Sequence, residues 1–334
     1  MVIRIESHAV EDFRCFRGEQ KLNFAEKDES DVNVTISDNG LGKTTLADSI
    51  QICLTGDFGD RTPLLPHDIV DDLEFGKKAT GKVSTVFSDS ELDQGFRFTR
   101  RLHTAQSSQG LINYVDPLRI EEDENGEWVN TGSFEAVNTV FPLLSFKFSK
   151  MDAGGSVASY DQWVATNWSE FVEDVADAAI KQSAARNTEL PEYFSGVYSL
   201  RDEMIRRINK TLPETRVFRN CKLQERDEGL VLRRKEPGMS SHLGSLAAGE
   251  KILVSYVVRI AAAEMLPAPP PLIGDTIFGR VDREIRQQMF KILNNSDRQS
   301  ILFLIKSEMS SLDLTPNFKL KGGEERGNNE IVAV

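Results

Sequence analysis

The feature that most constrains this chain is a strand, loop and helix pattern. Branched apolar residues alternate from Val32 to Ile36 as in a β-strand, small residues follow, and residues 44–54 suit a helix. Between them lies the glycine loop, residues 37–45, with the letters SDNGLGKTT. A strand, a glycine-rich loop and a helix in this order are a common setting for binding phosphate. The pattern therefore predicts an α/β fold with a phosphate-binding loop.

The chemistry of the glycine loop rests on its backbone. Successive N–H groups and a helix N-terminus hold a polyphosphate only where side chains stay clear, which explains Gly40 and Gly42. We expect Lys43 to reach the β- and γ-phosphates and the Thr44 hydroxyl to bind Mg²⁺. The pattern G-x-x-x-x-G-K-[ST] has glycine where this chain has Ser37, a small residue that can occupy the turn. The alternative is a chance glycine-rich loop before a helix.

Composition limits the class of protein. The chain has 334 residues, of which 40% are hydrophobic, enough for one large α/β domain or two medium ones. No apolar run is long enough to cross a bilayer, and charges interrupt the N-terminus where a signal peptide is apolar. The three cysteines lie far apart, which indicates neither a disulfide framework nor a zinc site. We therefore expect a cytoplasmic protein with no membrane partner.

The net charge of −12 argues against a protein that binds nucleic acid through an overall positive field. A local basic surface remains open. Its candidates are Arg97, Arg100 and Arg101 in one segment and residues 233–235 in another. In both segments a solvated strand end is the alternative to a DNA contact.

The N-terminal part of the chain reads mainly as β-strands. Strands are expected at residues 2–6 and 20–24, before the strand that enters the glycine loop. A turn between them, residues 11–18, carries Arg14, which can pair with phosphate or with a surface acid, and both readings stay open. Further strands are expected at residues 83–87, 96–102 and 111–115.

The middle of the chain changes character. After a strong hairpin signal at Asn125-Gly126, apolar residues at helical spacings predict helices over residues 160–185 and 200–212, with a break at 187–191. Their regularity does not last over enough heptads for a long coiled coil. A hairpin is expected around residues 227–229.

A second candidate site follows in the C-terminal part. Small residues and Gly249-Glu250 open a helix-compatible run, and such a helix N-terminus can bind an anion. Residues 272–275 then read as a buried strand ending at Asp275, whose carboxylate can hold Mg²⁺ beside Thr44. A helix over residues 283–293 and a strand over 300–305 are expected after it.

Four segments in this order resemble the head of an ABC-type ATPase of the SMC and double-strand-break-repair branch. They are residues 38–44 (DNGLGKT), 246–250 (LAAGE), 272–275 (LIGD) and 279–282 (GRVD). In that family one lobe carries the Walker A loop, the other carries the signature, Walker B and D-loop motifs, and paired heads sandwich ATP. Residues 49–56 and 275–282 look closest to the ATPase subunit of phosphorothioate DNA-modification (Dnd-type) systems.

The resemblance assigns roles residue by residue and implies ATP and Mg²⁺ as cofactors. Its nucleotide-binding set is Arg14, Ser37, Asn39, Gly40, Gly42, Lys43, Thr44, Thr45, Ala247, Gly249 and Glu250. Its catalytic set is Asp275 as the Walker B acid, Thr276, and Asp282 as the D-loop acid. The implied Mg²⁺ ligands are Thr44 and Asp275, with Asp152 as a substitute for a Q-loop glutamine.

Accessory positions depart from the family. Thr276 stands where most relatives have a glutamate that polarises water, and a hydroxyl cannot act as a carboxylate base, although Dnd-type relatives share this threonine. Residues 146–152 fall at the Q-loop and contain no glutamine, and Lys306 stands where a switch histidine is usual. Hydrolysis is therefore expected to be slow.

The resemblance also implies an organisation and a function. It divides the chain into an N-terminal lobe (residues 1–156), a helical segment in place of the coiled coil (157–215) and a C-terminal lobe (216–334). The expected protein is an SMC-like ATPase head that binds Mg·ATP and forms an ATP-dependent homodimer. It is expected to act in DNA modification, restriction or repair, with DNA and proteins of a defence system as candidate partners. The alternatives are a non-hydrolysing ATP-gated module that recruits a partner protein or nuclease, and a different P-loop enzyme such as a kinase.

Overall fold

The computed structural model describes most of the chain, and the structural statements below concern these residues. They are 3–24, 32–59, 63–89, 94–131, 150–152, 168–212, 218, 221–226, 229–234, 240–242, 246–279, 281–296, 298–310, 312, 314–323 and 328–334.

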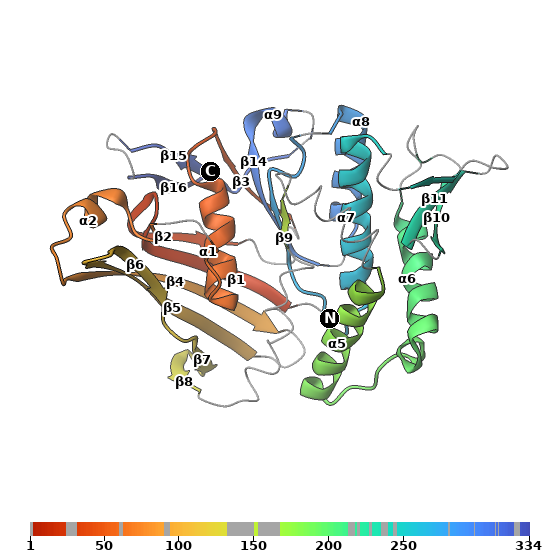
Figure 1. Ribbon diagram of the computed structural model, residues 1–334, viewed down its shortest axis with the longest axis horizontal. Helices are drawn as coiled ribbons and strands as arrows, with labels where there is room; N and C mark the ends of the chain where they lie inside the picture. The colour runs from red at the N-terminus through yellow and green to blue at the C-terminus, as the bar shows by residue number, and fades with distance from the viewer. Residues whose placement is uncertain are drawn as a thin grey trace.

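Two β-sheets with helix α1 (Lys43–Thr55) between them form one half of the molecule, and further helices with a small third sheet form the other (Figure 1). α1 contacts strands of both sheets. Its apolar residues Leu46, Ile50 and Cys53 are completely buried. The helix that follows the glycine loop is therefore fixed from two sides, and so is the start of that helix.

The parallel sheet carries the glycine loop. Its strand order is β16-β15-β3-β14-β13-β9, in which only the edge strand β16 is antiparallel to its neighbour. The bounds are β3 (Val32–Ser37), β9 (Lys150–Asp152), β13 (Leu272–Asp275), β14 (Ser300–Ile305), β15 (Phe318–Lys321) and β16 (Glu330–Ala333). Parallel sheets are covered on both faces, which explains the nearly continuous burial along β14. Because parallel strands end at the same edge, Ser37, Asp275 and Asp152 share one edge of this sheet.

The antiparallel sheet has the order β2-β1-β4-β5-β7-β8, with β6 paired to β5. The bounds are β1 (Ile3–Phe13), β2 (Phe16–Asn23), β4 (Lys78–Asp89), β5 (Gln94–Ser107), β6 (Gly110–Val115), β7 (Arg119–Glu124) and β8 (Glu127–Asn130). Along β4 buried residues alternate with partly exposed ones. One face of this sheet is therefore covered, in part by α1, and the other faces solvent.

Helix α7 (Ala248–Glu264) is the centre of the helical half. It is buried almost throughout from Ile252 to Ala263, as expected of a helix that is apolar on all sides. α6 and α8 pack against it. The other helices are α2 (His67–Asp71), α5 (Trp168–Arg186), α6 (Val197–Thr211), α8 (Arg283–Asn294), α9 (Lys306–Met309) and the 3₁₀ turn η3 (Glu192–Ser195), and a small sheet contains β10 (Cys221–Arg226), β11 (Gly229–Arg234) and β12 (Ser240–His242). Among the described residues, no helix is long and apolar enough to span a membrane.

The first strand differs from its prediction. It was expected to end at residue 6 and continues to Phe13, so the turn predicted over residues 11–18 is confined to Arg14 and Cys15. Pairing explains the difference, because β1 lies between β2 and β4 and is hydrogen-bonded to both. This two-sided pairing outweighs the weak strand propensity of the polar residues near its end.

The turns in the middle of the chain agree better with the sequence. The Asn125-Gly126 hairpin is confirmed, and both residues have positive φ angles of 59° and 91°. The break after α5 is confirmed at Asn187, whose φ is 52°, a conformation that commonly ends a helix. The predicted helix residues 160–167 and the turn residues 227–228 lie outside the described residues.

Candidate functional site

The glycine loop joins β3 to α1 through two glycines with positive φ. Gly40 has φ 82° and Gly42 has φ 100°, conformations that side chains disfavour. A Cβ atom on Gly42 would lie 2.6 Å from Cys15 Sγ and 2.8 Å from a ring atom of Phe16, whereas one on Gly40 would meet nothing within 4 Å. Gly42 is therefore required by space as well as by conformation.

Lys43 folds back over the glycine loop. Its ammonium donates to Ser37 Oγ at 3.0 Å and to the Asp38 carbonyl at 2.8 Å. Burial lowers the pKa of Lys43, and the negative charges of Asp275, Glu308 and Asp38 raise it in part. Ser37, which replaces the usual glycine, thus supplies a hydroxyl that helps to hold the lysine, a role that sequence reasoning missed.

Thr44 and Asp275 meet at the end of the parallel sheet. The Thr44 hydroxyl donates to Asp275 Oδ2 at 2.6 Å, although 231 positions separate them in the chain. The strand order β3-β14-β13 brings them together, and Asp275 is 3% exposed. A hydroxyl and a carboxylate are the hard oxygen ligands that Mg²⁺ prefers.

Asp152 lies at the same sheet edge. β9 runs parallel to β13, and its register places the Cα of Asp152 opposite that of Asp275. Neighbouring strands lie about 4.8 Å apart. Within the described ranges, no group of three or more His, Cys, Asp and Glu side chains is arranged to hold a metal by itself.

Thr276 has a strained backbone directly after Asp275. Its φ of 52° is an outlier for a β-branched residue. Its N–H donates to the Phe303 carbonyl at 2.8 Å, and its hydroxyl donates to Asp275 Oδ1 at 3.2 Å. Strain of this kind is concentrated at functional sites. Both Asp275 oxygens therefore accept from a threonine hydroxyl.

Arg14 reaches toward α1. Its guanidinium forms an ion pair with Asp48 of α1 at 2.8 Å, and both side chains are only about one eighth exposed. Arg14 therefore pairs with an acid, as one of the two readings expected, but this acid lies in α1 one turn beyond the glycine loop and the pair is largely buried. Arg14 has φ 50° at the tight turn between β1 and β2.

The predicted residues Ala247, Gly249 and Glu250 lie at the start of α7. Glu250 Oε2 accepts a hydrogen bond of 2.9 Å from the Ala247 N–H, which fixes this first turn. Asp282 caps α8 with its own side chain, whose Oδ1 accepts from the Ile285 N–H at 2.9 Å. None of the hydrogen bonds found among the described residues joins the start of α7 to the glycine loop.

Lys306, at the start of α9, closes the loop on the other side. Its ammonium forms an ion pair with Asp38 Oδ2 at 2.9 Å. This hydrogen bond is the main cause of a lowered pKa of Asp38. Both side chains are more than half exposed, so the pair contributes little to stability. It does place a cation at the mouth of the glycine loop.

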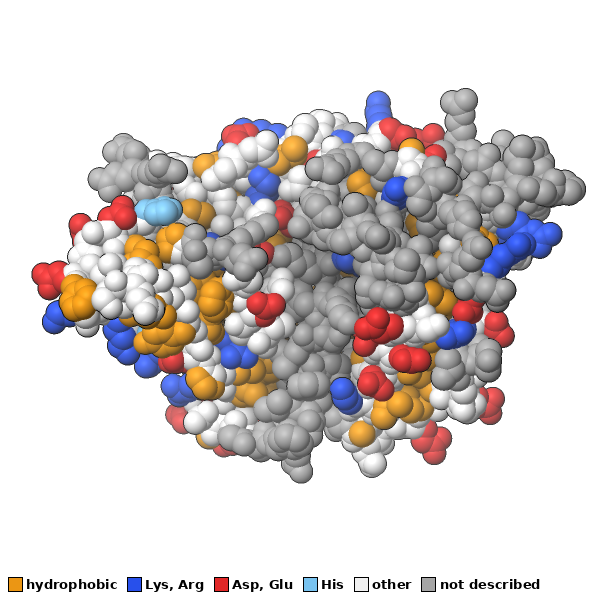
Figure 2. Space-filling model, in the orientation of Figure 1, with side chains coloured by type: hydrophobic (Ala, Val, Ile, Leu, Met, Phe, Trp, Pro, Cys, Tyr) orange, Lys and Arg blue, Asp and Glu red, His pale blue; other side chains and the backbone are white. Residues whose placement is uncertain are grey.

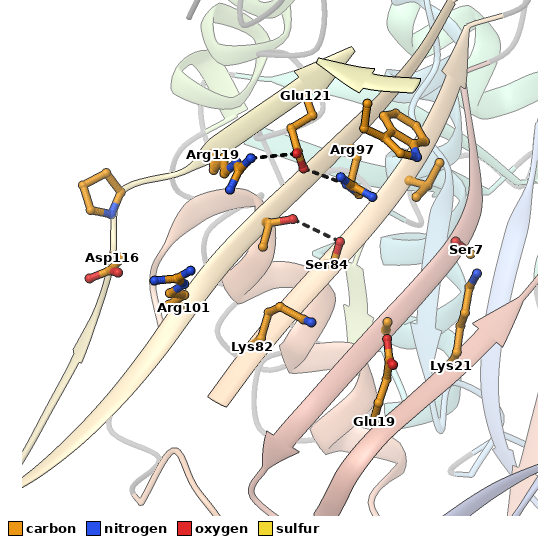
Figure 3. Close-up of a pocket in the computed structure, with 15 residues that line it drawn as sticks. Ser7, Glu19, Lys21, Lys82, Ser84, Arg97, Arg101, Asp116, Arg119 and Glu121 are labelled. Carbon is orange, nitrogen blue, oxygen red and sulfur yellow. Dashed lines mark hydrogen bonds and ion pairs between the residues drawn. The ribbon is translucent and has the colours of Figure 1, made fainter. Parts of the chain in front are cut away.

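A groove lies apart from the glycine loop, on the solvent face of the antiparallel sheet (Figure 3). Its volume is about 860 Å³. It is lined by five basic side chains (Lys21, Lys82, Arg97, Arg101 and Arg119) and three acidic ones (Glu19, Asp116 and Glu121).

The arginines predicted as a basic cluster have different roles. Arg97 pairs with Glu121 at 2.7 Å and lies over the Trp128 ring at 4.8 Å, and Arg101 lines the same groove. Arg100 instead donates to the carbonyls of Cys53 and Asp116 and thereby caps the end of α1. In the second cluster Arg233 is exposed on β11, and Lys235 lies outside the described residues.

Comparisons with known proteins agree with this geometry. A family profile described as "AAA domain" matches residues 9–228. An SMC head bound to the C-winged helix domain of ScpA gives a TM-score of 0.66 at 14% identity, covering 99% of this chain and 97% of that chain. An SMC head domain from Thermotoga maritima gives 0.53 at 16% identity, covering 99% of each chain. An Smc head domain from Pyrococcus furiosus, with an extended coiled coil and bound to the C-terminal domain of ScpA, gives 0.63 at 12% identity, covering 100% of this chain and 96% of that chain. A search of curated protein sequences found no match.

Proposed function

Because the chain belongs to the AAA domain family and has the fold of an SMC head, we propose that it binds Mg·ATP at the glycine loop and dimerises around it. The observation that supports this most is the hydrogen bond from Thr44 to Asp275. It brings a loop hydroxyl and a strand-end carboxylate to one point, where a magnesium ion on a phosphate needs its protein ligands.

In this proposal each side chain has one task. Lys43 exchanges its hydrogen bonds to the loop for bonds to phosphate oxygens, and the N–H groups of the loop bind the same anion. Thr44 and Asp275 hold Mg²⁺, with Asp152 at the neighbouring strand end as a further ligand. The ion supplies positive charge beside the phosphates. Arg14, Asn39 and Thr45 are the remaining residues that we assign to nucleotide binding on the copy that supplies the glycine loop.

The second copy completes the site. Ala247, Gly249 and Glu250 begin a long buried helix whose N-terminus favours an anion, and no hydrogen bond found within the described part of the chain joins them to the glycine loop of their own copy. We assign them to the nucleotide held by a partner copy, with Asp282 at the contact between copies. In this proposal the lobe of residues 1–156 carries the glycine loop, and the lobe of residues 216–334 carries the start of α7 and Asp282. Residues 157–215 join the two lobes.

Hydrolysis in this protein is proposed to be slow. Thr276 has no carboxylate that could accept a proton from the attacking water. Its hydroxyl, moreover, already donates to Asp275. The same observation favours a second candidate function, an ATP-gated module that does not hydrolyse ATP and recruits a partner protein or nuclease. In that case the nucleotide acts as a switch between monomer and dimer.

The partners proposed are proteins of a DNA-modification, restriction, repair or defence system. The SMC heads from two of the comparisons are bound to a domain of ScpA, so this fold has surfaces that accept a protein partner. DNA is a further candidate partner. Acidic side chains gather over α5 in Figure 2, whereas basic residues outnumber acidic ones in the groove of the antiparallel sheet. An arginine stacked on Trp128 adds a platform suited to a nucleic acid.

Equilibrium titration with ATP and Mg²⁺ tests the proposal. The wild type is expected to bind ATP, and Lys43→Ala is expected to lose at least about tenfold in affinity, because a charge-assisted contact to phosphate is removed. Failure of the wild type to bind would refute the proposed function. Phosphate release measured over hours distinguishes the slow ATPase from the non-hydrolysing ATP-gated module. If the wild type releases phosphate no faster than Asp275→Asn, only the non-hydrolysing module remains.

A further inference from the structure

Glu308 is a buried carboxylate that the nucleotide site described above does not use. It lies in α9, directly after β14, and its exposed fraction is 0%. Its Oε1 accepts a hydrogen bond from the Phe278 N–H at 2.7 Å, and its Oε2 accepts one from the Ile305 N–H at 2.8 Å. Burying a carboxylate is costly unless such bonds compensate. Glu308 thus joins the end of β14 to the segment that follows Asp275.

Arg286 of α8 holds the same segment from its other side. It donates to the carbonyl of Phe278 at 3.1 Å and to the carbonyl of Ser307 at 2.7 Å. Phe278 is therefore fixed through its N–H by Glu308 and through its carbonyl by Arg286. Burial raises the pKa of Glu308, while the two backbone hydrogen bonds and the Arg286 charge lower it. We call Glu308, Arg286 and Phe278 the clamp.

The clamp lies between two functional ends. The segment of residues 276–282 begins beside Asp275 and ends at Asp282, the cap of α8, on which Arg286 is carried. On the side of the glycine loop, the negative charge of Glu308 raises the pKa of Lys43, and the positive charge of Lys43 lowers the pKa of Glu308. Glu308 therefore interacts electrostatically with Lys43, the residue that we assign to phosphate binding. Glu308 also holds residues 276–282, which lead to the proposed contact between copies.

We propose that Glu308 and Arg286 are positioning residues that couple occupation of the glycine loop to the segment of residues 276–282, and thereby to pairing of two copies. This inference rests on the proposed function. The physical basis is that each Glu308 oxygen binds a different segment, so the segments move together and not separately. A polyphosphate that draws Lys43 away changes the charge facing Glu308, and the clamp passes this change to Asp282.

The main variant is Glu308→Gln, which keeps the shape and loses one acceptor. Its amide oxygen can accept one backbone N–H, but its NH₂ group faces the other. We expect ATP affinity to stay within about threefold of the wild type, and ATP-driven dimerisation to weaken by about tenfold or more, since one buried donor is left unpaired. Arg286→Lys is expected to show the same split, because an ammonium does not reproduce the fork of a guanidinium.

The matched control is Glu203→Gln in α6. Glu203 is likewise a helical glutamate whose two oxygens accept hydrogen bonds, in its case from the side chains of Arg206 and Arg207, and it lies outside the clamp. This variant is expected to change neither ATP affinity nor dimerisation. Melting temperatures of all three variants show whether each one folds.

Amide hydrogen exchange distinguishes coupling from a purely structural role of the clamp, because only coupling makes exchange in residues 276–282 depend on ATP. In the wild type, ATP is expected to slow exchange in residues 276–282 as well as in the glycine loop. In Glu308→Gln the glycine loop is expected to respond as before while residues 276–282 no longer respond. Loss of a structural contact alone speeds exchange in residues 276–282 equally with and without ATP.

The outcomes separate the two proposals. If the wild type binds ATP and both clamp variants retain its response in residues 276–282, the coupling is wrong and the proposed function stands. If both variants lose ATP affinity and dimerisation to the same degree, the clamp only supports the glycine loop and the coupling is again wrong. A wild type that does not bind ATP overturns the proposed function, and the coupling with it.

Discussion

Gly42 and Gly40 form a natural matched pair, and replacing each by alanine should destabilise the protein to different degrees. Both have positive φ, which costs an alanine about 1–2 kcal/mol. Loss of glycine's freedom in the unfolded chain offsets about 0.4–1 kcal/mol of that cost. With open space around its Cβ position, Gly40→Ala is expected to lower the free energy of unfolding by about 1 kcal/mol.

Gly42→Ala adds a steric term. Its Cβ would lie 2.6 Å from Cys15 Sγ and 2.8 Å from the Phe16 ring. Favourable contacts between such atoms begin at about 3.5 Å. Overpacking of this kind costs about 1–3 kcal/mol more, which gives a total of about 2–4 kcal/mol. Adding Cys15→Ala removes the nearest atom and should restore part of this term, while the Phe16 contact remains.

Urea unfolding without nucleotide measures these differences, with tryptophan fluorescence or circular dichroism as the signal. The expected order of stability is wild type, Gly40→Ala, Gly42→Ala with Cys15→Ala, and Gly42→Ala. Equal losses for Gly40→Ala and Gly42→Ala would refute the steric reasoning, because the turn at Cys15 and Phe16 would then yield without cost.

Further predictions concern other parts of the fold. Desolvation lowers the pKa of buried His8 to about 3, so below about pH 6.5 only the unfolded chain takes up this proton. The free energy of unfolding is therefore expected to fall by about 1.4 kcal/mol per pH unit as the pH decreases from about 6.5 toward 3, and this His8 contribution is complete above that range. Urea titrations should show a shallower fall with pH for His8→Gln than for the wild type. Arg100→Met removes the donor from the Cys53 carbonyl near the end of α1 and from the Asp116 carbonyl, and it should cost about 1–3 kcal/mol, whereas Arg101→Met, at an exposed position, should cost under about 0.5 kcal/mol in thermal melts. Thr44→Val keeps the size but removes the hydroxyl that meets Asp275, so ATP affinity should fall about tenfold with Mg²⁺ and stay unchanged when EDTA replaces Mg²⁺.

Local sequence patterns predicted the elements around the glycine loop well. The strand before it, the helix after it, the buried strand ending at Asp275 and the long helix after Gly249 are all present. Each of these elements has strong local signals, such as branched alternation, paired glycines or a continuous apolar run. The SMC-head fold, expected from the resemblance of four segments to that family, is also confirmed.

Other features depend on contacts between distant residues, and no local pattern predicts them. Glu308 reads as one more polar residue after a strand, and its complete burial follows from N–H groups supplied by the end of β14 and by residue 278. Ser37 looked like a weakened glycine position, whereas its hydroxyl accepts from Lys43. The strands β15 and β16 were not expected, because β15 is fixed by pairing with β3 from the far end of the chain.

The measurement that tests the proposed function most directly is the molecular mass in solution, determined by light scattering with and without Mg·ATP. The wild type is expected to change from one copy to two when Mg·ATP is added, and Lys43→Ala is expected to remain a monomer under the same conditions. Gly249→Asp puts a carboxylate at the start of α7. This variant should bind ATP but not dimerise, because the new negative charge repels the phosphates of the nucleotide held by the other copy. A wild type that binds ATP and keeps the mass of one copy would contradict a shared site between two heads.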